Sequence, residues 1–193
     1  MSEKYFVNHK FINKLKSTNI KKMFSRFLLV AVLVLSMLYV ALGGAKEAGI
    51  AFLDETAKKE GIMKLKSGML FEILKSSSNE NARSPRVGDS CKTTYLGTFI
   101  DGSRFDGGTM SFAPNQVIKG WTEAMQLMAE GDKWKLYIPY ELAYGERGRP
   151  PKIPGGSVLV FEIEIHKVEG PGKTAQEGKD MLAAALAENA GDL

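Results

Sequence analysis

The chain has 193 residues, of which 44% are hydrophobic, so it is long enough to bury one ordinary core and still carry extensions at its ends. Its net charge of +4 is unevenly placed, because residues 1–26 hold seven Lys or Arg against the single acid Glu3, which leaves a net charge of −2 for the rest. A basic groove with interleaved aromatic residues is therefore excluded from the folded part, and we expect no nucleic-acid partner.

An uncharged stretch, residues 27–45, directly follows the basic leader. Its apolar centre, residues 27–42, is longer than the roughly 7 to 15 residues of a signal-peptide centre and shorter than the roughly 20 of a spanning helix. Small residues at its end favour cleavage, the long preceding region favours an uncleaved anchor, and initiation at Met23 would leave an ordinary signal peptide. Residues 1–45 are predicted to be a basic leader with either a signal peptide or a membrane anchor.

Either form of this segment would leave its basic flank in the cytosol and carry the following domain across a membrane. We therefore predict a protein of the secretory pathway. Its folded domain would be either membrane-anchored on the lumenal or extracytoplasmic side, or secreted after signal cleavage. Cys91 is the only cysteine, so the chain forms no internal disulfide. Because Cys91 begins a segment of alternating apolar residues, we interpret it as a buried structural thiol.

A helix is predicted next, since apolar residues that include Ile50, Leu53 and Ala57 recur at helical spacing within residues 45–61. The final glycine of this range is a typical helix stop. We assign residues 46–65 to this amphipathic leader helix.

Strands dominate the following region. Residues 66–74 are typical of a strand, and the polar residues 76–89 of a loop that separates this strand from the main body of the sheet. Alternating apolar and polar residues predict half-buried antiparallel strands in three further segments, residues 91–99, 134–138 and 157–168. In the last of these, Leu159, Phe161, Ile163 and Ile165 share the buried face.

One helix interrupts the strands. It is predicted from Lys119 to about Gly131, with an apolar face formed by Trp121, Ala124, Met125 and Met128. Several strands and a single short helix imply an α+β domain over residues 66–169, in which a twisted antiparallel β-sheet wraps around that helix. The tail, residues 170–193, holds a capping-box pattern at Thr174 to Glu177, which predicts a short C-terminal helix with Met181, Leu182, Ala185 and Leu186 on its apolar face.

Most enzyme classes need residues that this chain lacks. Its two histidines are His9, in the basic leader, and His166, on the polar face of a strand. The core therefore lacks the histidines that a Ser-His-Asp triad, a Cys-His pair or a histidine-rich metal site would need. A phosphate-binding loop at residues 172–174 is excluded because Lys167 stands where that motif requires glycine.

Two motifs carry the functional prediction: VIKGWTEAMQLMAEGDKWKLYIPYELAYG at residues 117–145, and YLGTFIDGSRFDGG at residues 95–108. Together they resemble the FKBP-type peptidyl-prolyl cis-trans isomerases, which bind rapamycin and tacrolimus, and more narrowly the macrophage infectivity potentiator-like branch. The resemblance runs from about Gly49 to Glu169. It implies the FKBP fold described above and an enzyme that rotates Xaa-Pro bonds of proteins without a cofactor or metal.

The resemblance also implies a site. In the family, the counterpart of Trp121 forms the pocket floor, Asp106 is the polar member, and the backbone N–H of Ile118 and the hydroxyl of Tyr144 bind ligand carbonyls. The residues expected to be catalytic are Tyr95, Phe105, Asp106, Tyr144 and Phe161. Those expected to bind substrate are Met110, Val117, Ile118, Trp121 and Ile153. Periodicity alone would assign Phe105, Val117 and Phe161 to the core, and Asp106 to a turn.

Departures from the family pattern modify this expectation. Met110 stands where the family often has an aromatic ring, and a methionine makes a softer wall. Arg149 and Lys152 stand where drug-binding relatives often have apolar or small residues. We therefore expect activity on proline-containing peptides and a preference for acidic flanking residues. The resemblance implies the macrolides rapamycin and tacrolimus as ligands, but these departures leave the affinity for them open.

Two other functions stay open from the sequence. The chain could be a catalytically silent peptide-binding or chaperone module on the same fold, because fold does not guarantee activity. It could also be a membrane-tethered scaffold whose C-terminal helix recruits a partner. The sequence does not specify an oligomeric state.

Overall fold

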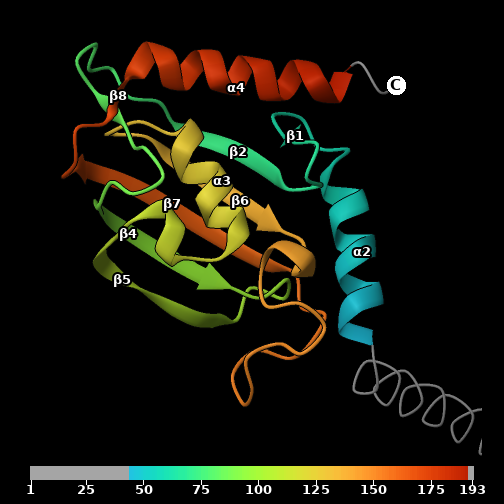
Figure 1. Ribbon diagram of the computed structural model, residues 1–193. Helices are drawn as coiled ribbons and strands as arrows, with labels where there is room; N and C mark the ends of the chain where they lie inside the picture. The colour runs from blue at the N-terminus through green and yellow to red at the C-terminus, as the bar shows by residue number, and fades with distance from the viewer. Residues whose placement is uncertain (1–43, 191–193) are drawn as a thin grey trace, which may run out of the picture. The chain divides into compact units, whose positions relative to one another are not determined.

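The computed structural model describes residues 44–190, with side chains up to Glu188 (Figure 1). The predicted basic leader and most of the apolar segment lie outside the described residues. Within the described range, no helix combines the length and the apolar character that a membrane crossing requires.

A six-stranded antiparallel sheet forms the body of the domain, with the strand order β1-β2-β6-β7-β4-β5. Figure 1 shows the helix α3 lying across one face of this sheet. This arrangement confirms the predicted α+β fold with an antiparallel sheet and one packed helix. The strands are β1 (Met63–Lys64), β2 (Leu70–Lys75), β4 (Cys91–Thr98), β5 (Arg104–Phe112), β6 (Lys133–Ile138) and β7 (Leu159–Val168).

The core forms between α3 (Lys119–Leu127) and the sheet. The predicted buried face of β7 is confirmed, because its four apolar side chains are at most 5% exposed. The predicted helix face is also confirmed, with Trp121, Ala124, Met125 and Met128 all buried. A Cβ added to Gly120 would lie 2.6 Å from Cγ2 of Ile138, so the first turn of α3 approaches β6 more closely than any larger residue would allow.

The leader helix α2 (Ala45–Thr56) ends before the predicted glycine, and the face that it buries matches the predicted one only at Leu53, which packs against the core. Ile50 was expected to pack, but 47% of its surface is exposed. The buried residues are instead Gly49 and Thr56, and Phe52 between them contacts the Tyr137 ring at a centroid distance of 6.0 Å.

The missing side chain of Gly49 explains this orientation. A Cβ there would lie 2.6 Å from Cγ2 of Val158, so the helix can come this close to the start of β7 only along its glycine side. Spacing of apolar residues did not reveal this, because the close contact is made by a residue without a side chain.

A second, two-stranded sheet joins the segment predicted as a polar loop to the C-terminal tail. Its strands are β3 (Arg83–Ser84) and β8 (Lys173–Thr174). The loop prediction for residues 76–89 is therefore wrong at its centre, where Ala82 and Ser84 are buried. A strand of two residues has no periodicity of its own, and only its partner far along the chain defines it.

The tail continues as α4 (Ala175–Ala190), a helix of 16 residues. The predicted capping box is confirmed: the Glu177 N–H donates to Thr174 Oγ1 at 3.2 Å, and the Thr174 N–H donates to Glu177 Oε2 at 2.8 Å. The sequence left open whether the apolar face of this helix docks on the domain or on a partner. Leu182, Ala185 and Leu186 pack against the core, whereas Met181 is 40% exposed. The helix thus uses most of its apolar face to dock on its own domain.

Candidate active site

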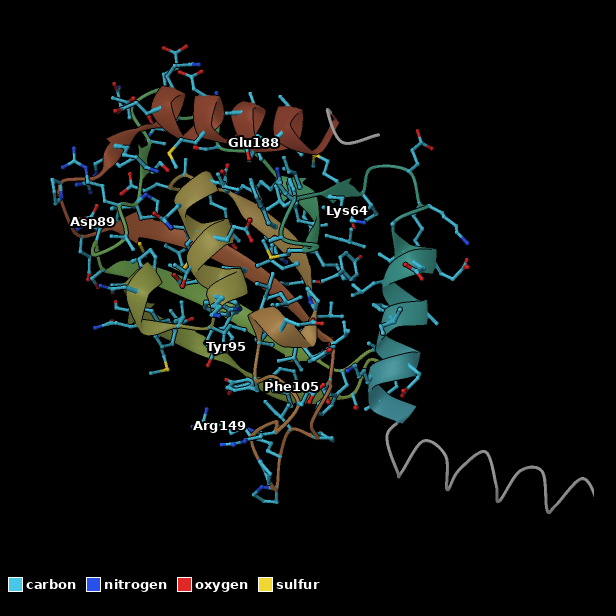
Figure 2. The ribbon with its side chains drawn as sticks, turned by 45° about the vertical axis from the view of Figure 1, so that its right-hand side comes forward. Lys64, Asp89, Tyr95, Phe105, Arg149 and Glu188 are labelled. Carbon is cyan, nitrogen blue, oxygen red and sulfur yellow. The ribbon has the colours of Figure 1, made fainter. Side chains whose placement is uncertain are left out.

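A pocket of about 250 Å³ opens between β4, β5, the start of α3 and the loop that follows β6. Nine of the ten residues predicted for the site line it: Tyr95, Phe105, Asp106, Met110, Val117, Ile118, Trp121, Tyr144 and Phe161. Figure 2 labels two of them, Tyr95 and Phe105, and they lie in the same part of the domain.

Ile153 is the predicted site residue that does not line the pocket. It is 3% exposed and packs in the hydrophobic core. Its backbone pairs with that of Arg149, which does line the pocket. Ile153 therefore anchors the loop that carries Arg149.

Three lining residues were not predicted as site residues: Phe112, Gln116 and Arg149. Phe112 could have been found from the sequence, because it is two residues from Met110 on the same strand, and alternate residues of a strand share a face. Gln116 ends the short helix η2 (Pro114–Gln116), which no periodic pattern marks.

The floor of the pocket is aromatic. Trp121 is 4% exposed, and three rings meet it nearly at right angles: Tyr95 at 5.2 Å, Phe161 at 5.2 Å and Phe112 at 5.9 Å between centroids. Phe105 in turn meets Phe161 at 5.4 Å with an angle of 86°. Such edge-to-face contacts hold each ring in one orientation, so the floor and walls are rigid apolar surfaces.

A β-bulge brings Phe105 and Asp106 to the same pocket. Gly97 pairs with Asp106 and Thr98 pairs with Arg104, so Phe105 has no partner of its own on β4. In a regular strand these neighbours would point to opposite faces of the sheet. The extra residue breaks that alternation and lets an apolar wall and a carboxylate line one site.

Gly97 leaves the space in which two of the pocket rings lie. A Cβ at this position would lie 2.8 Å from Cζ of Phe105 and 2.8 Å from Cε1 of Phe161. Both rings are at most 7% exposed, so neither can move away without disturbing the core.

We expect Gly97→Ala to lower the isomerase activity that the sequence resemblance implies by roughly three- to tenfold, because displaced rings would narrow or tilt the pocket, at a cost of about 1–3 kcal/mol for an overpacked site. The measurement is kcat/KM on a proline-containing peptide, the substrate that the resemblance implies, at matched folded fraction. Gly88→Ala is the control, since a Cβ at Gly88 meets nothing within 4 Å. Equal activity of the two variants would contradict the proposed role of the ring positions.

The Asp106 carboxylate is held by the backbone of its neighbour. Its Oδ1 accepts a hydrogen bond from the Gly107 N–H at 2.9 Å. Partial burial, followed by the charge of the Asp106 carboxylate, raises the pKa of the Tyr95 hydroxyl above its usual value of 10.0. Tyr95 therefore stays protonated at neutral pH, and both residues belong to the polar part of the pocket lining.

Two further donors of the pocket have no partner among residues 44–190. The backbone N–H of Ile118, at the start of α3, makes no hydrogen bond there, and neither does the hydroxyl of Tyr144, next to the helix η3 (Tyr140–Leu142). Unpaired donors at the wall of an apolar pocket are suited to hold the carbonyl groups of a bound peptide.

The groups needed for covalent or metal chemistry are not gathered at this site. The described residues contain no cluster of three or more His, Cys, Asp or Glu that could bind a metal ion. Burial, followed by the charge of Asp89, raises the pKa of the Cys91 thiol to about 12, so it is not a nucleophile at neutral pH. His166 lies on the exposed sheet face, with Nε2 at 2.7 Å from Oγ1 of Thr94.

A larger groove of about 420 Å³ lies between α2, the β1–β2 turn and η3. It contains none of the ten predicted residues and has no aromatic floor comparable to Trp121. The smaller pocket is therefore the candidate active site, because it combines rigid rings, a held carboxylate and unpaired donors.

Comparisons with known proteins show which family the chain resembles. Residues 81–166 match the family model of the FKBP-type peptidyl-prolyl cis-trans isomerases. A macrophage infectivity potentiator of Trypanosoma cruzi is 42% identical over 147 residues, which cover 72% of this chain and 74% of the relative. An FKBP-type 22 kDa peptidyl-prolyl cis-trans isomerase of Escherichia coli is 44% identical over 125 residues, which cover 62% and 59%.

Among solved structures, a peptidyl-prolyl cis-trans isomerase of Pseudomonas syringae superimposes with a TM-score of 0.62 at 33% identity. The match covers 66% of this chain and 95% of the bacterial one. The shared fold includes the sheet and helix that build the pocket.

Proposed function

Because this chain belongs to the family of FKBP-type peptidyl-prolyl cis-trans isomerases, we propose that the pocket over Trp121 is where it accelerates rotation about Xaa-Pro bonds. One observation carries the proposal. Predicted site residues from five separate segments of the chain surround a single pocket with an aromatic floor.

The reaction suits such a pocket. Rotation about the peptide bond has a barrier of about 18–20 kcal/mol that arises from amide resonance, and no covalent bond breaks. The planar ground state is more dipolar than the twisted transition state. A dry aromatic pocket therefore withdraws solvation from the ground state more than from the transition state, and this difference in binding lowers the barrier.

Each polar group then has a distinct role. The proline ring would lie on Trp121 between the walls of Phe105 and Phe161. The Ile118 N–H and the Tyr144 hydroxyl would donate to carbonyl oxygens on either side of the rotating bond. Asp106, held by the Gly107 N–H, would face the rotating carbonyl and disfavour its planar orientation. Substrate-binding energy is thereby used to favour the twisted amide.

We also propose where the enzyme acts. The basic leader and the apolar segment of residues 27–42 support delivery of the domain across a membrane, so its substrates would be proteins that fold outside the cytosol. A membrane anchor and a cleaved signal both give this orientation.

For the macrolides rapamycin and tacrolimus we propose reduced affinity. Met110 is 53% exposed and flexible, so it forms a poorer wall than an aromatic ring. Arg149 lines the same pocket and would have to give up water to contact an apolar ligand. The affinity for a short peptide is lowered less, because the peptide covers less of the pocket rim.

The test is a protease-free isomerisation assay on the full chain in mild detergent, comparing the wild type with Asp106→Asn. We expect the wild type to accelerate the cis-to-trans exchange of a proline peptide, and the variant to lose roughly 10-fold in kcat/KM, because the neutral amide no longer repels the planar carbonyl. Addition of rapamycin measures the drug affinity in the same assay.

A catalytically silent binding module would give a different result in this assay. It would bind the peptide with no acceleration, and Asp106→Asn would change only the binding constant. That outcome from a folded wild-type protein would overturn the proposed function.

A further inference from the structure

We propose that Arg149 selects substrates that carry an aspartate or glutamate directly beside the proline, an inference that rests on the proposed function. Arg149 lines the pocket, and its guanidinium carbon lies 5.9 Å from the centre of the Tyr144 ring. Figure 2 shows Arg149 in the same part of the domain as Tyr95 and Phe105. Residues that flank a proline bound over Trp121 would leave the pocket beside this guanidinium.

The backbone around Arg149 is held in one place. Its N–H donates to the Ile153 carbonyl at 2.8 Å, and the Ile153 N–H donates back at 3.0 Å. Ile153 is in turn buried in the core. Gly148, with φ of +66°, leaves no room for a side chain, since a Cβ would lie 2.3 Å from the Ile153 carbonyl oxygen. Arg149 therefore extends from a fixed point at the pocket rim.

The loop presents positive charge that no acid of the domain neutralises. Arg147, Arg149 and Lys152 are exposed, and none of them forms an ion pair with another residue of the described range. Of the two acids in the loop after β6, Glu146 pairs with Lys46 of α2 at 2.8 Å, and Glu141 lines the separate groove beside α2. Arg149 is thus available to a ligand at the pocket rim, and Arg147 and Lys152 add positive charge to the same loop.

The pocket itself has two charged sides. Asp106 lies on β5 and is held by the Gly107 N–H, whereas Arg149 lies on the loop after β6. An acidic substrate residue is attracted only at the loop side, and a basic one is repelled there. An arginine can also bind a carboxylate through two parallel hydrogen bonds, which gives the contact a preferred geometry.

The expected size of the preference follows from the exposure of these charges. Pairs of exposed charges in water change an equilibrium by roughly two- to fivefold and are screened by salt. We therefore expect kcat/KM for a peptide with Glu beside the proline to exceed that for its Gln counterpart by roughly three- to fivefold at low salt. The ratio should approach one at high salt.

The experiment measures this Glu-to-Gln ratio for peptides in which the residue before or after the proline is varied in turn, with Lys as a third choice. The enzymes are the full chain and its variants R149Q, R149E and K179Q. Lys179 lies on α4, which Figure 1 shows on the opposite side of the domain from the loop, and it is exposed without an ion pair. K179Q therefore matches the charge change of R149Q away from the site.

We expect R149Q to remove the preference, R149E to shift it toward the Lys peptide, and K179Q to keep it. Because a misfolded variant lowers all rates together, a reversed ratio in R149E cannot come from instability. Equal rates for the Glu and Gln peptides in the wild type, or a ratio unchanged in R149E, would overturn the inference. If the wild type accelerates the Gln peptide normally, the proposed function stands even then; if it accelerates no peptide, both fail.

Discussion

Phe105→Ala should lower kcat/KM for prolyl isomerisation by roughly 10- to 100-fold, which corresponds to about 1.5–3 kcal/mol of lost apolar contact in the transition state. The ring of Phe105 forms a wall of the pocket, is 7% exposed and meets Phe161 edge-to-face at 5.4 Å. Its removal would open the wall to water, which solvates the planar amide and cancels the advantage of a dry site. Peptide exchange measured by NMR at saturating and limiting substrate gives kcat and KM separately.

Loss of stability must be separated from loss of chemistry in this variant. Removing a buried phenylalanine costs about 3–5 kcal/mol of folding free energy, so activity is normalised to the folded fraction measured by near-ultraviolet circular dichroism. Phe52→Ala is a matched control, because Phe52 packs on Tyr137 and does not line the pocket. Phe105→Leu keeps apolar volume without a planar ring and should lose less activity. Unchanged kcat/KM in folded Phe105→Ala would exclude the pocket as the site.

The parts of the fold that sequence predicted well are those with long regular periods. From Phe161 to His166 the strand β7 alternates between buried residues, which face the core under α3, and half-buried or exposed ones. Trp121 and Met125 recur at helical spacing because the helix buries one stripe. In both elements a single face is buried, so the pattern of apolar residues is enough to define the element.

Prediction failed where contacts depend on a distant partner or on an absent side chain. The strand Arg83–Ser84 exists because Lys173 and Thr174 pair with it, almost ninety positions further along the chain. Helix α2 faces the sheet through Gly49, which carries no hydrophobic signal. Propensity and periodicity describe local preferences, and neither contains these contacts.

The candidate site was likewise predicted in part from the sequence and in part not. The motif residues came together around one pocket, but the β-bulge at Phe105 that allows it to share the pocket with Asp106 is not visible in the residue types. Ile153 was expected to bind substrate and instead fixes Arg149 from the core side. The resemblance to a family identified the site residues, whereas the register of the backbone explains why they line one pocket.

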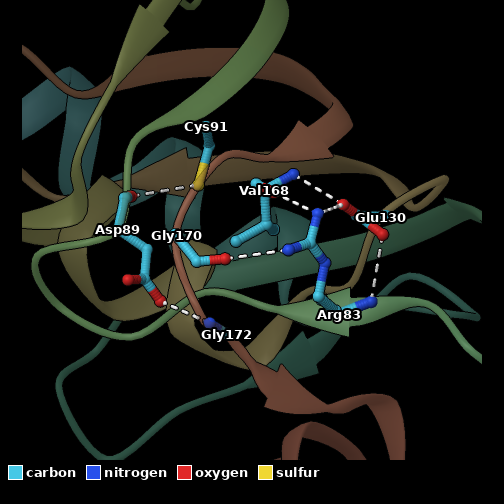
Figure 3. A network of polar contacts seen from close by, with 7 residues as sticks. All are labelled: Arg83, Asp89, Cys91, Glu130, Val168, Gly170 and Gly172. Carbon is cyan, nitrogen blue, oxygen red and sulfur yellow. Dashed lines mark hydrogen bonds and ion pairs between the residues drawn. The ribbon is translucent and has the colours of Figure 1, made fainter.

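A polar network around Arg83 and Glu130 connects the C-terminal tail to the domain (Figure 3). The carboxylate of Glu130 accepts hydrogen bonds from the Val168 N–H at 2.7 Å, from the Arg83 N–H at 3.2 Å and from the Arg83 guanidinium at 3.1 Å. Arg83 also donates to the carbonyls of Val168 and Gly170. The network joins β3, the end of β7 and the start of the tail.

Asp89 adds a further hydrogen bond between the domain and the tail. Its Oδ2 accepts from the Gly172 N–H at 3.1 Å, and a Cβ on Gly170 would collide with its other oxygen. The tail is thus held at two points, by Glu130 through Arg83 and by Asp89 directly, before it enters α4.

We expect Glu130→Ala to lower the free energy of unfolding by about 2–3 kcal/mol, because it leaves the backbone N–H groups of Arg83 and Val168 without their acceptor and the Arg83 guanidinium without its carboxylate. The Glu130 side chain is 17% exposed, which places it between a surface pair and a fully buried one. Urea denaturation at pH 7 gives the value. Glu164→Ala is the control: Glu164 pairs with Lys75 at 3.3 Å near the surface, and its loss should cost less than about 1 kcal/mol. Similar losses in the two variants would mean that the network adds nothing beyond an ordinary surface pair.

The acid limb of the stability curve tests the same network independently. Burial alone would raise the pKa of Glu130, but hydrogen bonds from Val168 and Arg83 outweigh it and hold this pKa below its ordinary value of 4.5. A carboxylate whose pKa is lower in the folded state contributes its stability in full above the unfolded value, and loses it as pH falls through the folded one. The stability gap between the wild type and Glu130→Gln, which stays neutral at every pH, should therefore be constant from pH 7 to about 5 and shrink below 4.5. A gap that persists unchanged into strong acid would place its origin in packing rather than in the charge of Glu130.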